Sequence, residues 1–215
     1  MTHPHITSDR TRQNACAGQS AQRRSGGCRR AWVLACSLLV GACIAQGQVE
    51  TKYRIDPAKS SVQFSLTGIH TVDGSFSVSS GNITFNRTTG AMSGSVDVAA
   101  ASGTSGERLR DKRMDKEELL VNKFPAITFS PARFTGTLAP AGTSTLQVAG
   151  TLTLLGHPHP VTVPMTVSIQ GNDCTASGTF VIPYVAWALK DPSTFILRMD
   201  KHVTVRLNFS GTLSR

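Results

Sequence analysis

The sequence predicts an all-β fold of antiparallel strands with one short helical crossover, and three observations lead to this prediction. From residue 52 onwards, apolar and polar side chains alternate, as in residues 61–68, where Val62, Phe64 and Leu66 share one face. Short turn signals separate the alternating runs, and a single charge-rich segment interrupts them. A period of two with Ser and Thr on the opposite face is typical of antiparallel strands that bury one face.

The alternation continues to the end of the chain and predicts eight or more strands. The residues expected to face inward are Phe76, Val78, Ile83, Phe85, Val96, Val98, Ile127, Phe129, Leu146, Val148, Leu152, Leu154, Val161, Val163, Met165, Val167, Ile169, Ala176, Phe180, Ile182, Val203, Val205, Leu207 and Phe209. Turns are expected at residues 79–81, 88–90, 140–142 and 171–173. Such a pattern fits either a sandwich or a closed barrel and does not choose between them.

The charge-rich segment 105–125 breaks the alternation. Leu109, Arg113, Lys116, Leu119 and Leu120 recur at near-helical spacing within it. We therefore expect a short helix over residues 107–121 that crosses between strands and is ended by Pro125. Its charged side chains are expected to face solvent.

Residues 1–45 are expected to form an N-terminal leader, which leaves residues 46–215 as the domain. Arg29 and Arg30 precede the uncharged stretch 31–45, which is shorter than the ~20 residues that a membrane-spanning helix needs. Cys43, Ile44 and Ala45 have the small-x-small pattern of a signal-peptide cleavage site, so we expect export to the bacterial periplasm. In the alternative interpretation, residues 40–43 form a lipoprotein box and a lipid on Cys43 anchors the protein to a membrane.

Charge and cysteine content argue against a nucleic-acid partner and against an internal disulfide. The leader carries +5 of the net charge of +9, so residues 46–215 carry only +4. They contain no dense run of Lys and Arg, and nucleic acid is therefore not expected as a partner. Four of the five cysteines lie in the leader, and Cys174 alone cannot form an internal disulfide.

No motif indicates catalysis, and the protein is not expected to be an enzyme. The chain lacks G-x-S-x-G, and its histidines have no evident partner in the sequence. His157 and His159 are the strongest candidates for a metal site. Residues two apart on a strand face the same side, and two imidazoles can begin such a site. However, Pro158 and Pro160 lack backbone donors, so we expect residues 157–160 to form the turn between two strands, and we expect no metal and no cofactor.

Several stretches, taken together and in order, resemble the YceI-like family of exported bacterial proteins. They are YRIDP at 53–57, VDGSF at 72–76, RDKRM at 110–114, FPAITF at 124–129 and GTLTLLG at 150–156, and the resemblance extends over 53–213. It implies a lipocalin-like antiparallel β-barrel whose apolar cavity holds a polyisoprenoid or an isoprenoid quinone in the periplasm. This chain departs from the family pattern at Leu155–His157, where a histidine-glycine order is commoner, and at Asp115, where many relatives carry histidine.

The resemblance implies that inward-facing residues bind the ligand for transport, storage or sequestration. The expected cavity wall consists of Phe64, Leu66, Phe76, Ile83, Phe85, Ile127, Phe129, Leu152, Leu154, Val163, Met165, Phe180, Ile182, Val205 and Leu207, and the expected mouth of Tyr184, Trp187 and Phe195. An isoprenoid tail gains about 0.8 kcal/mol per buried CH₂. The alternatives are a stress or structural protein with a filled core and a metal-associated accessory protein that uses His157 and His159. The sequence leaves open whether the chain forms a dimer.

Overall fold

The computed structural model describes residues 50–193 and 198–215. The chain divides into two units, Met1–Ala45 and Gln46–Arg215, and the description below concerns the second unit. The predicted leader, Cys43 and Phe195 lie outside the described residues. Within the part of the chain that is described, no helix has the length and apolar character needed to cross a membrane.

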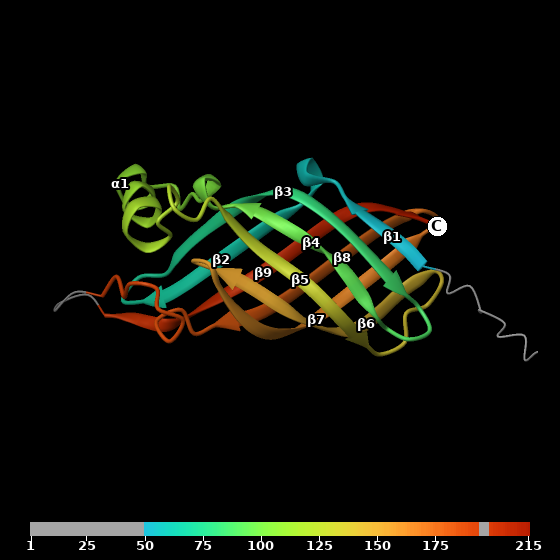
Figure 1. The fold of residues 1–215 in the computed structure, drawn as a ribbon. Helices are drawn as coiled ribbons and strands as arrows, with labels where there is room; N and C mark the ends of the chain where they lie inside the picture. The colour runs from blue at the N-terminus through green and yellow to red at the C-terminus, as the bar shows by residue number, and fades with distance from the viewer. Residues whose placement is uncertain (1–49, 194–197) are drawn as a thin grey trace, which may run out of the picture. The chain divides into compact units, whose positions relative to one another are not determined.

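One antiparallel sheet contains all nine strands of the described residues (Figure 1). The strands are β1 (Glu50–Ile55), β2 (Ser61–Gly68), β3 (Val72–Asn86), β4 (Met92–Ala99), β5 (Ala126–Thr135), β6 (Gly142–Leu154), β7 (His157–Gln170), β8 (Asp173–Ile182) and β9 (Met199–Ser214). Their order is β1-β3-β2-β9-β8-β7-β6-β5-β4, and β3 also pairs with β4. This pairing closes the sheet into a barrel and excludes the sandwich.

The barrel has eight positions because β1 and β2 share one of them. Both strands lie between β3 and β9: Tyr53 of β1 opposes Ile83 and Leu213, and Val62 of β2 opposes Phe76 and Leu207. A short 3₁₀ turn, η1 (Pro57–Lys59), separates the two strands, and the Asp56 side chain caps it by accepting from the Ala58 N–H. The predicted lipocalin-like barrel is therefore confirmed.

The crossover from β4 to β5 contains the predicted helix in a shorter form. It comprises a 3₁₀ turn, η2 (Ala100–Ser102), the helix α1 (Arg108–Arg113) and a π-helical turn, η3 (Met114–Glu118). The Glu107 carboxylate caps α1 by accepting from the N–H groups of Leu109 and Arg110. The helical turns end at Glu118, three residues before the expected end near 121 and before Pro125, because Leu119 turns into the core and Leu120 takes a left-handed backbone conformation with φ of 48°.

The predicted turn at residues 79–81 is also wrong, since β3 runs without interruption from Val72 to Asn86. The register with β4 shifts between Val78, which opposes Val98, and Ser80, which opposes Asp97, so Ser79 is an extra residue. Such a β-bulge reverses the alternation locally, and this reversal produced the apparent break in the sequence pattern. The Ser79 hydroxyl donates to the Asp97 carbonyl, which compensates part of the disrupted ladder.

The histidine–proline motif forms strand rather than turn, which corrects the prediction for residues 157–160. The turn consists of Leu155 and Gly156, with φ of 52° and 76°, and β7 begins at His157 opposite Leu154. In such a two-residue hairpin, His157 and every second residue after it direct their N–H groups to β6. Pro158 and Pro160 therefore face the other side, where β7 pairs with β8 only from Met165 onwards. The missing donors cost little there, because no strand is paired with that edge.

Candidate ligand-binding cavity

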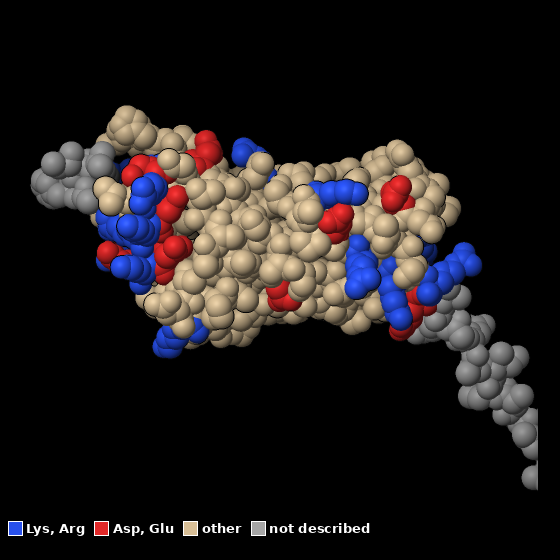
Figure 2. Space-filling model, turned by 90° about the horizontal axis from the view of Figure 1, so that it is seen from above, with Lys and Arg blue, Asp and Glu red and all other residues tan. Residues whose placement is uncertain are grey.

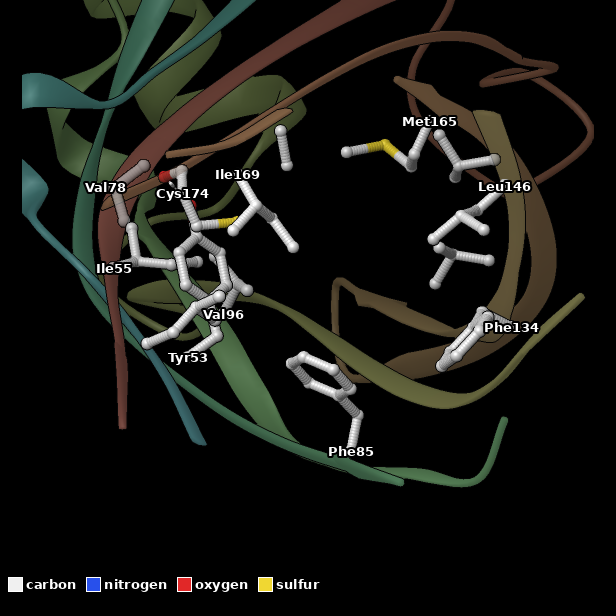
Figure 3. Close-up of a cluster of buried hydrophobic side chains, with 14 residues drawn as sticks. Tyr53, Ile55, Val78, Phe85, Val96, Phe134, Leu146, Met165, Ile169 and Cys174 are labelled. Carbon is white, nitrogen blue, oxygen red and sulfur yellow. Dashed lines mark hydrogen bonds between the residues drawn. The ribbon is translucent and has the colours of Figure 1, made fainter. Parts of the chain in front are cut away.

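The interior of the barrel contains an elongated cavity rather than a filled core. Inward-facing residues form two clusters of buried side chains, one with Tyr53, Phe85 and Phe134 and the other with Leu152 and Tyr184. Figure 3 shows the labelled side chains of the first cluster pointing from the barrel wall towards a common open interior. The cavity continues past both clusters and has a volume of about 280 Å³.

Every residue of the predicted cavity wall lines this cavity, from Phe64 on β2 to Leu207 on β9. Ten further lining residues were expected to face inward but were not assigned to the cavity wall: Val62, Val96, Val98, Leu146, Val148, Val167, Ile169, Ala176, Val203 and Phe209. Lys190 also lines the cavity. The lining residues that the sequence prediction did not indicate are Tyr53, Met92, Met114, Glu118, Leu119, Pro131, Phe134, Leu138, Cys174, Leu189 and Pro192. Those on strands follow the same alternation as the predicted wall except at Phe134, because the register of β5 with β6 shifts between Pro131 and Arg133. Met114 and Glu118 come from the helical crossover, and Lys190 comes from the segment after β8, so a period of two could not indicate them.

The end of the barrel that contains Tyr53, Phe85 and Phe134 is here called the distal end, and its cavity wall includes no charged residue. The Phe85 and Phe134 rings meet edge to face with centroids 6.2 Å apart. The Tyr53 hydroxyl donates to the Cys174 carbonyl at 3.2 Å, so its polar atom is satisfied. Burial raises the pKa of the Cys174 thiol to about 11 and also raises the pKa of Tyr53, so both side chains are neutral at physiological pH. The distal end therefore suits an apolar chain.

The opposite end, here called the mouth, is covered by the crossover 100–125 and by residues 183–193. It contributes the two charged residues among those that line the cavity, Glu118 and Lys190. Lys190 forms an ion pair with Glu117, which links the segment after β8 to the crossover. The Tyr184 hydroxyl donates to the Asp200 carbonyl at 2.8 Å, and burial raises its pKa to about 12. The cavity thus changes from uncharged to polar along its length.

Two carboxyl groups of the crossover are partly withdrawn from water. Burial raises the pKa of Glu118, whose side chain is 20% exposed and lies 3.9 Å from the Arg113 guanidinium. Burial, and next the charge of Asp111, raises the pKa of Asp115. The Asp115 Oδ1 atom is buried without a hydrogen-bond partner among the described residues. A carboxyl group with a raised pKa holds its proton to higher pH and can then donate a hydrogen bond.

The predicted mouth residues are placed differently from one another. Tyr184 lines the cavity, whereas Trp187 is not part of the wall. Residues 184–188 form a turn in which the Trp187 N–H donates to the Pro183 and Tyr184 carbonyls. The Trp187 indole lies parallel to the His159 ring, with centroids 4.0 Å apart. Phe195 lies outside the described residues.

His157 and His159 face the same side of β7, as the alternative metal hypothesis requires, but their surroundings differ. His157 is exposed, and His159 is half-buried under Trp187 with its Nε2 atom unpaired among the described residues. Burial, and next the charge of His157, lowers the pKa of His159. In the described ranges, no group of three or more His, Cys, Asp or Glu side chains is arranged to hold a metal ion.

Comparison with known proteins connects this barrel to a family. A family model described as YceI-like domain matches residues 53–211. A crystal structure of BcnA from Burkholderia cenocepacia has a TM-score of 0.58 at 22% identity and covers 75% of this chain and 99% of its own. A polyisoprenoid binding domain from Saccharophagus degradans has a TM-score of 0.62 at 15% identity and covers 75% and 98%.

A YceI protein from Campylobacter jejuni has a TM-score of 0.56 at 14% identity and covers 68% of this chain and 88% of its own. At these identities the solved structures support the fold alone. A search of curated protein sequences finds no match. The family model, in contrast, matches most of the barrel from β1 into β9, and on this basis the chain belongs to the family of YceI-like domains.

Proposed function

We propose that this protein is an exported, non-enzymatic carrier that holds a long-chain isoprenoid lipid or isoprenoid quinone in the barrel cavity. The observation that carries the proposal is the cavity itself, which is lined by apolar side chains from the distal end to the mouth and has charged residues only at the mouth. The chain is similar in fold to the polyisoprenoid binding domain of Saccharophagus degradans, and this similarity supports an isoprenoid as the class of ligand. Transport, storage and sequestration are all served by such binding.

The polarity of the wall supports one orientation of the ligand. An apolar tail gains about 0.8 kcal/mol for each CH₂ that it removes from water, and the distal end offers no competing polar site. A polar head group would lose hydration there without compensation, whereas Glu118 and Lys190 provide hydrogen-bonding groups at the mouth. The tail therefore lies towards Tyr53 and Phe134, and the head lies beside the crossover.

Mass spectrometry of bound lipid tests the proposal. Residues 46–215 contain the whole closed sheet and both core clusters, so this unit is expressed in a bacterial host, purified without detergent and extracted with organic solvent. We expect a stoichiometric long-chain isoprenoid in the extract, or uptake of added polyprenol or ubiquinone from a cyclodextrin complex. Neither a co-purified isoprenoid nor any uptake would contradict the proposal.

A matched pair of variants separates cavity binding from surface adsorption. Val205 lines the cavity, whereas Val181 on the adjacent strand β8 is 54% exposed. Val205→Trp is expected to fill the cavity and abolish uptake, and Val181→Trp is expected to leave uptake unchanged. Thermal unfolding of both variants identifies any loss of uptake that results from unfolding, and in that case Leu207→Trp replaces Val205→Trp.

A further inference from the structure

The charged side chains of the crossover are arranged asymmetrically. Residues 107–118 contain five basic and five acidic residues, so their formal net charge is zero. The acidic groups are engaged locally: Glu107 caps the helix, Asp111 accepts from Ser105 and Thr104, and Glu117 pairs with Arg113 and Lys190. Asp115 and Glu118 are half-buried.

Three cations of the same segment point to solvent. Arg108, Lys112 and Lys116 are exposed, and no ion pair within residues 50–193 and 198–215 involves them. They are spaced four residues apart, which places neighbours on one face of a helix. Figure 2, which views the barrel from above, shows charged side chains gathered at both of its ends, with one group over the crossover. The crossover thus presents positive charge outward although its net charge is zero.

Exposed apolar side chains accompany these cations. Leu109, Ile69 and Leu120 are 74%, 58% and 39% exposed, and they are three of the four large apolar residues with exposed side chains in the described part of the chain. Leu109 and Leu120 belong to the crossover, and Ile69 lies in the β2–β3 connection at the same end of the barrel (Figure 1). Cations interspersed with exposed leucine and isoleucine match the charge and the apolar boundary of an anionic lipid surface.

The same segment also borders the cavity. Met114, Glu118 and Leu119 line the mouth, and they alternate along the chain with the outward-facing Lys112 and Lys116. We propose that the outer face of the crossover, defined by Arg108, Leu109, Lys112 and Lys116, docks onto an anionic phospholipid bilayer with the cavity mouth against the membrane. A lipid then passes between bilayer and cavity without crossing water. The docking does not depend on the identity of the bound lipid.

Cosedimentation of residues 46–215 with vesicles tests the docking. The vesicles consist of phosphatidylcholine alone or of phosphatidylcholine with about 30 mol % phosphatidylglycerol. We expect binding to the anionic vesicles only, and a loss of that binding when salt is raised from about 50 mM to about 500 mM. The triple variant R108Q/K112Q/K116Q should bind at least tenfold more weakly, because each cation near an anionic surface contributes about fivefold.

Two control variants distinguish a specific face from net charge. K52Q/R54Q/R133Q removes the same charge from exposed positions on β1 and β5, away from the crossover, and should retain binding to within about twofold. Leu109→Ser keeps the charge and should weaken binding by removing the most exposed apolar side chain. Equal binding to both vesicle types, or an equal loss in the K52Q/R54Q/R133Q control, would overturn the proposal.

Uptake measurements keep this proposal separate from lipid carriage. Uptake of polyprenol from cyclodextrin requires the cavity but no membrane, so its failure would contradict the carrier function alone. If docking is correct, the R108Q/K112Q/K116Q variant takes up lipid from cyclodextrin normally and from anionic vesicles at least tenfold more slowly. Equal rates of uptake from vesicles for the variant and the wild type would contradict docking alone.

Discussion

The two ends of the barrel differ in the polarity and packing of the side chains that line the cavity. At the distal end, Phe85 and Phe134 pack edge to face, and the buried Tyr53 hydroxyl is satisfied by a backbone carbonyl. At the mouth, Glu118 and Lys190 line the cavity, and irregular segments of chain replace regular strands. The distal end therefore supplies packing, whereas the mouth presents polar groups on irregular segments of the chain.

Removing one aromatic ring from the distal end is expected to have the largest effect on stability. Phe134→Ala should lower the free energy of unfolding by about 3–5 kcal/mol, because Phe134 is 5% exposed and its loss leaves a void against Phe85. The matched change at the mouth end, Leu109→Ala, should cost less than about 0.5 kcal/mol, because Leu109 is 74% exposed. Urea unfolding of both variants measures the difference. Similar costs for the two variants would contradict the assignment of packing to the distal end.

Removing a hydroxyl from each end tests the same contrast on a smaller scale. Tyr53→Phe deletes a buried hydrogen bond and leaves the Cys174 carbonyl without this donor, so we expect a loss of about 1–2 kcal/mol. Tyr184→Phe deletes a partly buried bond to the carbonyl of Asp200, an exposed residue that water can reach. It should cost less than about 1 kcal/mol. Denaturant midpoints at constant m-value provide the measurement, and a larger loss for Tyr184→Phe would reverse the proposed ranking.

The strand residues of the cavity wall could be predicted from the sequence to a greater extent than the mouth, although Tyr53 and Phe134 of the distal end were missed. Alternation identified the strands and the inward-facing residues of the wall, because one buried face imposes a period of two. It failed at Ser79, where a bulge adds one residue. The turn expected at His157–Pro160 from the missing donors of the prolines was wrong for another reason, because these prolines face an unpaired edge of β7. Both features depend on which neighbouring strand is present, and a single sequence does not contain this information.

At the mouth, the side chains are positioned by contacts between segments far apart in the sequence. Glu118 reaches the cavity because the π-helical turn η3 ends where Leu119 enters the core. Lys190 lies beside it through its ion pair with Glu117, 73 residues earlier in the chain. Trp187 was expected at the mouth from its aromatic character, but it packs on His159 instead. Periodicity has no bearing on such contacts, so the prediction of the mouth rested on aromatic residues outside the strands, of which Tyr184 lines the cavity and Trp187 does not.

The carboxyl groups near the mouth predict a pH dependence of stability in the acidic to neutral range, where the buried Cys174 thiol and Tyr53 hydroxyl of the distal end stay protonated. Burial raises the pKa of Glu118 in the folded protein above its unfolded value of about 4.3. The native state then binds more protons than the unfolded state between these two pKa values, so the contribution of Glu118 to stability falls as pH rises through that window. Below this window Glu118 is protonated in both states, so the cost of burying its charge is absent.

Glu118→Gln should remove this pH dependence. We expect the variant to be more stable than the wild type at pH 7 by less than about 1 kcal/mol. The gain is small because the variant loses the interaction with Arg113 at 3.9 Å. At acidic pH the two proteins should have the same free energy of unfolding. Urea unfolding across the acidic to neutral range measures the effect. Glu107→Gln is the control with the opposite sign, because its backbone hydrogen bonds to Leu109 and Arg110 lower the pKa of Glu107 and its stabilisation is lost on acidification. Parallel pH profiles for wild type and Glu118→Gln would contradict the prediction.

The smallest expected effect on stability concerns the ion pair that links the two segments at the mouth. Lys190 and Glu117 are 52% and 45% exposed, so their pairing contributes about 0–1 kcal/mol, and Lys190→Gln should barely change the free energy of unfolding. The control Lys201→Gln breaks another surface ion pair, with Asp191 at 3.3 Å, which does not involve the crossover. Both variants should therefore unfold like the wild type.

The two variants should differ in lipid release. Lys190 ties residues 183–193 to the crossover across the mouth, so its loss frees one side of the exit without altering the cavity wall at the distal end. We expect Lys190→Gln to release bound polyprenol to a cyclodextrin acceptor up to about fivefold faster, which corresponds to the upper limit of a surface ion pair. Lys201→Gln should match the wild type, and high salt should accelerate the wild type towards the Lys190→Gln rate. If release were limited at the distal end instead, Lys190→Gln would have no effect, and the variant Phe134→Ala would be the faster one.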